Sequence, residues 1–174
     1  MEYKAKEVGG VKGLGKIYMA EAPLDKQIEA FEKVGIVYPF LVTPDETAQI
    51  RLAGVNDNYT RTSMVPLAIK GGKTILSRNS PIMHPLMASA IVNAHRNDRY
   101  LNMNKDVYEV AEALAKSQTG IEPEDRTAIV MSKEGDFELT PGMDETKFIL
   151  GKQVIPYFAK FVNKGKDGKI QFYN

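Results

Sequence analysis

The sequence contains no cysteine, which excludes disulfides, thiolate metal sites, iron–sulfur clusters and a cysteine nucleophile. Histidine is nearly absent too, with only His84 and His95. A continuous helix would hold these two about 16 Å apart, too far for one metal ion, and Pro85 opposes such a helix. The sequence therefore predicts no metal site and no cofactor.

Long apolar runs are also missing. No stretch approaches the roughly 20 residues of a membrane span, and no apolar run follows the charges of Met1–Lys4 as in a signal peptide. We therefore expect a soluble, intracellular protein of the cytoplasm that does not act at a membrane. Its 174 residues, 43% of them hydrophobic, can bury a core within one domain, residues 1–174.

The clearest helix signal is Thr43-Pro44-Asp45-Glu46. Thr43 and Glu46 can form a reciprocal capping box, and proline is favoured at the first helical position. Gly54 supplies the stop, so a helix is expected over residues 44–53. A second helix is expected from Asn104 to Gly120. It has four apolar residues on one side: Val107, Val110, Ala111 and Leu114.

Two hairpins are predicted from turn residues between β-rich runs. Thr62–Ile69 and Lys73–Ser77 flank Gly71-Gly72, and both central residues of a type I′ turn need positive φ. Residues 127–131 and 136–139 flank a Lys-Glu-Gly turn in the same way.

The C-terminal part is harder to assign. Residues 144–162 are left open between helix and strand, because Phe148-Ile149-Leu150 has no readable period. Ile170–Tyr173 is expected to be a last strand. Hairpins and helices alternate without a regular βαβ order. The expected fold is α+β, a mostly antiparallel sheet built from hairpins with three to four helices packed on it.

The net charge of +1 hides charge blocks. Residues 51–99 hold seven basic and two acidic residues, whereas residues 100–149 hold five basic and eleven acidic ones. Residues 150–174 are basic again, with five lysines and one aspartate. These blocks either neutralise one another inside the fold or create a bipolar surface that steers partners.

The candidate binding residues come from the first basic block. Three belong to the Gly-Gly hairpin and three to the polar cluster that follows: Lys70, Lys73, Arg78, His95, Arg96 and Arg99. Arginine forks suit phosphate or carboxylate, so these residues are predicted to form one basic face. Arg51 and Arg61 belong to the same block, and Tyr59 and Tyr100 could stack on bases.

Three motif readings fail. Gly13-x-Gly15 lacks the rest of a dinucleotide fingerprint, and Lys70–Thr74 lacks the first glycine of a phosphate-binding loop. Asp136 and Glu138 share a strand face as magnesium ligands do, but a solvated acidic hairpin is the simpler interpretation.

Three functions remain open. The leading hypothesis is a non-enzymatic binding or assembly protein, with a protein partner or a second copy of itself. Eight methionines and the aromatic Phe158 and Phe161 would suit such contacts. The first alternative is a nucleic-acid-binding module that uses the basic residues of 51–99. The second is a small enzyme for an anionic substrate, with His95 as acid or base and Arg96 or Arg99 as anion clamp.

Overall fold

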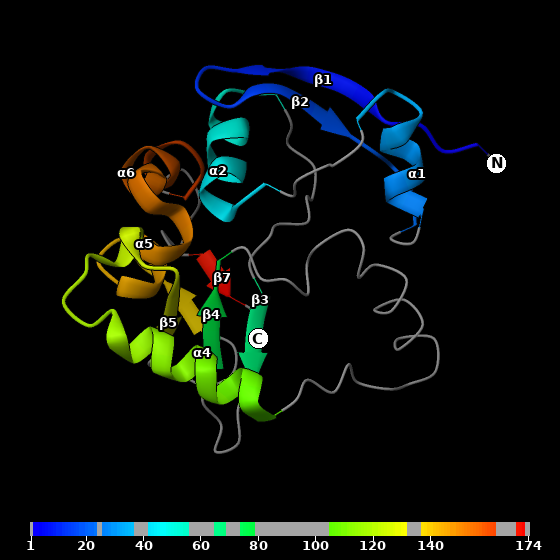
Figure 1. The fold of residues 1–174 in the computed structure, drawn as a ribbon. Coiled ribbons are helices and arrows are strands. Elements are labelled where there is room, and N and C mark those ends of the chain that lie inside the picture. The colour runs from blue at the N-terminus through cyan, green and yellow to red at the C-terminus, as the bar shows by residue number, and fades with distance from the viewer. Residues whose placement is uncertain are drawn as a thin grey trace.

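The structure, a computed structural model, describes residues 2–23, 26–36, 42–55, 65–68, 74–78, 105–131, 137–162 and 170–172. These segments form helices and small antiparallel sheets, which confirms the predicted α+β class (Figure 1). No helix within them is long and apolar enough to cross a membrane.

A hairpin and a short helix form one end of the molecule. Strands β1 (Lys6–Val11) and β2 (Gly15–Met19) pair antiparallel, and α1 (Gln27–Glu32) lies beside them (Figure 1). The turn needs glycine, since Gly13 and Gly15 have φ values of 91° and 83°.

Helix α2 (Pro44–Leu52) begins as its capping signal predicts. The Thr43 hydroxyl accepts a hydrogen bond from the Glu46 amide at 3.3 Å. The Glu46 carboxylate accepts one from the Thr43 amide at 2.7 Å. The capping box is therefore confirmed, and it orients α2 so that Ala48 and Ile50 are buried.

The central sheet has the order β3-β4-β5, with β3 (Val65–Ala68), β4 (Thr74–Ser77) and β5 (Ala128–Val130). The antiparallel β3–β4 pair confirms the two strands of the Gly-Gly hairpin, whose turn lies outside the described residues. The second predicted hairpin is wrong. β5 pairs with β4, and β6 (Phe137–Leu139) pairs instead with β7 (Ile170–Phe172), which confirms the last predicted strand.

Alternating residues of the central sheet face two different layers. Ile75 and Ala128 pack against helix α4 (Lys105–Ser117) through its Ala115. Leu76 and Ile129 point to the opposite face, where α2, α5 (Asp144–Leu150) and α6 (Val154–Tyr157) lie. The sheet is thus covered by helices on both faces (Figure 1).

Residues 144–150, which the sequence left open, form helix α5. A 3₁₀ turn (Gly151–Gln153) leads into α6, and a π-helical turn (Phe158–Val162) continues it. Another 3₁₀ turn, Pro123–Asp125, precedes β5 and contacts α5. Phe158 belongs to the main buried cluster, so its predicted role in docking a partner is wrong.

Only part of the apolar side predicted for helix α4 contacts the sheet. Ala111 and Ala115 make the contact with the sheet. Val110 and Leu114 remain 67% and 41% exposed. The side chain of Val107 lies outside the described part of the chain. The apolar side of α4 is therefore wider than the surface the sheet covers.

Candidate functional site

Arg78 is the predicted site residue whose position the structure describes. It follows the last residue of β4, and its side chain is only 14% exposed. One nitrogen of the guanidinium, Nη1, lies 3.3 Å from the Asp45 carboxylate of α2. The other, Nη2, donates to the Phe148 carbonyl of α5, and the whole group lies 4.6 Å from the Phe148 ring centre.

The electrostatics of Arg78 are those of an enclosed cation. Burial lowers the pKa of its guanidinium, and the carboxylates of Asp45, Asp125 and Glu124 only partly oppose that shift. Its Nε has no hydrogen-bond partner among the described residues. Arg78 therefore ties α2, β4 and α5 together and offers little surface to an external ligand.

The other predicted site residues cannot be placed with it. Lys70, Lys73, His95, Arg96 and Arg99 lie outside the described residues, as do Tyr59 and Tyr100. That the five basic residues among them form one basic face remains a prediction. Among the residues that are described, no three histidine or acidic side chains gather as metal ligands.

A second cation-rich site lies where the end of α2 meets α6. Arg51, in the last turn of α2, donates from Nη1 to the Tyr157 hydroxyl at 2.6 Å. Its guanidinium lies 5.7 Å from the Tyr157 ring centre and 5.4 Å from that of Phe161. These distances fall within the range of cation–π attraction.

Lys160 joins the same cluster from the π-helical turn. Its ammonium donates to the Leu52 carbonyl at 2.7 Å and lies 5.2 Å from the Phe161 ring centre. The bond to Leu52 satisfies a carbonyl at the C-terminus of α2, where a cation is favoured. Two positive side chains thus lie against one aromatic ring, which contacts Tyr157 at 5.0 Å between ring centres.

No carboxylate within the described segments pairs with Arg51 or Lys160, whereas six of the eleven other lysines and arginines with described side chains have one. Lys6, Lys16, Lys26, Lys33, Arg78 and Lys116 each lie within 4.0 Å of an acidic side chain. The acids of α2 are engaged at its other end, Asp45 by Arg78 and Glu46 in the capping box.

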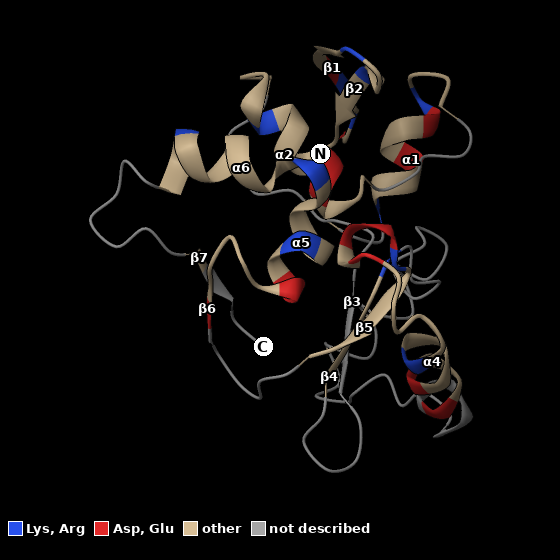
Figure 2. Cartoon of the chain, turned by 90° about the vertical axis from the view of Figure 1, so that its left-hand side faces the viewer, with Lys and Arg blue, Asp and Glu red and all other residues tan. Residues whose placement is uncertain are grey.

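Residues 151–162 add Lys152 and contain no acidic residue. Figure 2 shows this side of the molecule, with basic residues on α2 and on the turn that continues α6. We call Arg51, Tyr157, Lys160 and Phe161 the cationic face. No described carboxylate balances the charge of this face. Like charges held together in this way attract an anion.

The sequence contained part of this site. Arg51 belongs to the basic block of residues 51–99, and residues 150–174 carry a net charge of +4, but no sequence pattern connects the two. Tyr157 and Phe161 are four residues apart, the spacing of neighbours on one helix side, and that was the available signal.

Searches of family models, curated proteins and solved structures found no match to this chain.

Proposed function

We propose that the protein is a non-enzymatic binding protein whose cationic face holds a nucleic acid. One observation carries the proposal. Arg51 and Lys160 both lie within 5.4 Å of the centre of the Phe161 ring, and neither has a carboxylate partner in the described segments. Phosphates supply the missing negative charge, and arginine and lysine are the residues that usually contact them.

The surroundings of the two cations favour a nucleic acid over an isolated anion. Ile155, on α6, is 73% exposed, and the neighbouring Pro156 is exposed as well. This apolar surface directly precedes Tyr157 of the cationic face in sequence and suits sugars and bases, as the cations suit phosphates. The two cations are also fixed in place by Tyr157 and Leu52, so less side-chain entropy is lost on binding.

The test is fluorescence anisotropy with a labelled single-stranded oligonucleotide of roughly 20 nucleotides, titrated at several salt concentrations. We expect binding at low salt that weakens steeply as salt rises. Lys160→Gln alone should reduce the slope of log affinity against log salt by about 0.7, the value for one lost phosphate contact on a single strand. Arg51→Gln/Lys160→Gln should reduce it by roughly twice that.

The matched control is Lys26→Gln/Lys116→Gln, which removes the same charge from the N-cap of α1 and from α4, where both lysines are ion-paired. If this control loses as much affinity and slope as Arg51→Gln/Lys160→Gln, net charge and not the cationic face drives binding. No binding to single-stranded DNA or RNA at low salt would end the nucleic-acid proposal.

Self-association is a second candidate function, supported by the exposed apolar side of α4. Val110 and Leu114 lie one helical turn apart, and the exposed Ala113 and Ser117 next to them are uncharged. In a two-fold contact each patch meets its own copy, so an uncharged patch brings no like-charge repulsion. One helix side is smaller than a standard interface of about 1,200–2,000 Å², so the association would be weak.

Sedimentation equilibrium across a wide concentration range tests this candidate. We expect the average mass to rise with concentration in the unaltered chain. Leu114→Glu should abolish the rise, because it buries a charge in the contact. Ala113→Glu adds the same charge at the edge of the patch and should have a smaller effect. A mass that stays monomeric at the highest concentration contradicts the candidate.

A further inference from the structure

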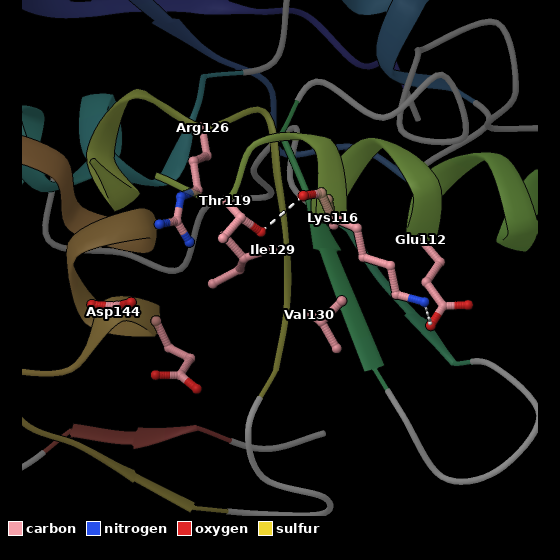
Figure 3. A pocket seen from close by; sticks show the side chains of 9 residues that line it. Glu112, Lys116, Thr119, Arg126, Ile129, Val130 and Asp144 are labelled. Carbon is pink, nitrogen blue, oxygen red and sulfur yellow. Dashed lines mark hydrogen bonds and ion pairs between the residues drawn. The ribbon is translucent and has the colours of Figure 1, made fainter. Parts of the chain in front are cut away.

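A cleft of about 490 Å³ lies between α4, β5 and the first turn of α5. That volume is in the range of small-ligand sites. β5 is the last strand in the order of the central sheet, so the cleft opens at the sheet edge. Figure 3 shows side chains from these elements around the opening. This cleft is distinct from the cationic face and shares no residue with it.

The inner part of the cleft is apolar. Ala115 is buried and Val130 half-buried on the α4 side of β5, whereas the buried Ile129 lines the cleft from the other side of this strand. On the α4 side, Ala115 and Val130 can cover an aliphatic group of a ligand, which gains from leaving water. The apolar part does not by itself select a class of ligand. The charged residues around it determine which class fits.

Two of the charged residues already satisfy each other. The Lys116 ammonium lies 2.9 Å from the Glu112 carboxylate, one helical turn away on α4 (Figure 3). Glu145 is buried and has an interaction of its own. These three side chains therefore contribute little unmatched charge to the cleft.

Arg126 and Asp144 are different. Arg126 donates from Nε to the Ile121 carbonyl at 2.6 Å, which fixes the direction of its guanidinium. Its two Nη groups have no partner within the described residues and point toward Asp144 in Figure 3. Asp144, the first residue of α5, is not ion-paired with any described cation. The cleft thus carries one unmatched positive and one unmatched negative side chain.

We infer that this cleft binds a small zwitterion of the amino-acid type with an aliphatic side chain. Its carboxylate would accept hydrogen bonds from the Arg126 fork, and its ammonium would donate to Asp144. A purely anionic ligand would be repelled by the Asp144 carboxylate, and a purely cationic one by the Arg126 guanidinium. Each would therefore be disfavoured. The aliphatic side chain would rest on Ala115 and Val130, on the α4 side of β5.

The test is calorimetric titration of the full chain with three probes of similar shape: L-leucine, isocaproate and isoamylamine. The second probe lacks the ammonium and the third lacks the carboxylate. We expect measurable binding of L-leucine, and affinity lower by roughly tenfold or more for each of the other two, since each loses a charged hydrogen bond. Backbone-amide NMR shifts should change at residues 112–119, 126–130 and 144–145.

Variants show which side chains are responsible. Arg126→Gln and Asp144→Asn should each weaken L-leucine binding by roughly tenfold or more. Lys152→Gln, a charge loss away from the cleft, should leave it unchanged. Thermal melts of each variant separate loss of binding from loss of folding. The inference is overturned if L-leucine does not bind, if isocaproate binds equally well, or if folded Arg126→Gln retains full affinity.

Discussion

Phe148→Ala should be among the most destabilising single substitutions in the described part of this protein. The Phe148 side chain is fully buried in α5, within the cluster that also contains Leu76 and Phe158. Truncating a buried phenylalanine to alanine costs about 3–5 kcal/mol, because transfer energy is lost and a cavity remains. A typical domain has only about 5–15 kcal/mol of stability, so a large share of it would be lost.

Phe148 has a second role that increases the expected loss. Its ring faces the Arg78 guanidinium at 4.6 Å, a contact of about 0.5–2 kcal/mol when desolvated. Its removal therefore also deprives the enclosed cation of one of its few contacts. Urea unfolding followed by circular dichroism measures the combined effect as a shift of the midpoint at constant slope.

Ile155→Ala is the matched control, because the same kind of truncation is made at a side chain that is 73% exposed. It should change the free energy of unfolding by less than about 0.5 kcal/mol. A loss below about 1 kcal/mol for Phe148→Ala would contradict the burial of Phe148 in the cluster with Leu76 and Phe158, since so small a cost is typical of surface sites.

Local signals predicted those parts of the fold whose partners lie close in sequence. The capping box of α2 joins Thr43 to Glu46, and the paired strands β3 and β4 are only a few residues apart in sequence. The prediction of the second hairpin is wrong because each of its two strands pairs with a strand that is distant in sequence. β5 pairs with β4, about fifty positions earlier, and β6 pairs with β7.

The uncertainty over residues 144–150 has a physical cause. Five of the seven residues of α5 are buried: Glu145, Thr146, Phe148, Ile149 and Leu150. A helix buried on most of its sides has no polar stripe, so its sequence shows no period to separate it from a strand. The helical conformation of these residues is therefore determined by the packing of α5 between α2 and the sheet.

The candidate sites show the same limit. A sequence reports that Arg78 is charged, but not that Asp45, 33 positions earlier, encloses it with Phe148. Lys160 reaches the Leu52 carbonyl across 108 positions, so no local pattern could connect Arg51 with Lys160. Charge blocks indicate where cations are abundant, whereas the fold decides which of them lack a carboxylate.

Removing the carboxylate of Asp45 should destabilise the protein through Arg78. The Arg78 and Asp45 side chains are only 14% and 26% exposed, so Asp45→Ala leaves a largely buried cation without its partner. Breaking a fully buried pair costs about 3–5 kcal/mol, and partial solvent access should reduce this to about 2–3 kcal/mol. Arg78→Met keeps an unbranched side chain near Phe148 and removes the charge, so it should cost less.

The double variant Asp45→Ala/Arg78→Met completes the cycle. Urea unfolding should show a loss smaller than the sum of the two single losses by about 0.5–3 kcal/mol, as for residues in direct contact. Additive losses would mean that the two side chains do not interact in solution.

The same variants distinguish a structural Arg78 from a binding one. The sequence predicts that Arg78 binds an anion together with other basic residues, yet its guanidinium is engaged by Asp45 and the Phe148 carbonyl. If that engagement is its role, folded Arg78→Met should keep the oligonucleotide affinity and salt slope of the unaltered chain, while Lys160→Gln lowers both. If Arg78→Met instead lowers the slope as much as Lys160→Gln, Arg78 contacts phosphate, and the anion-binding surface must extend from the cationic face to the end of β4.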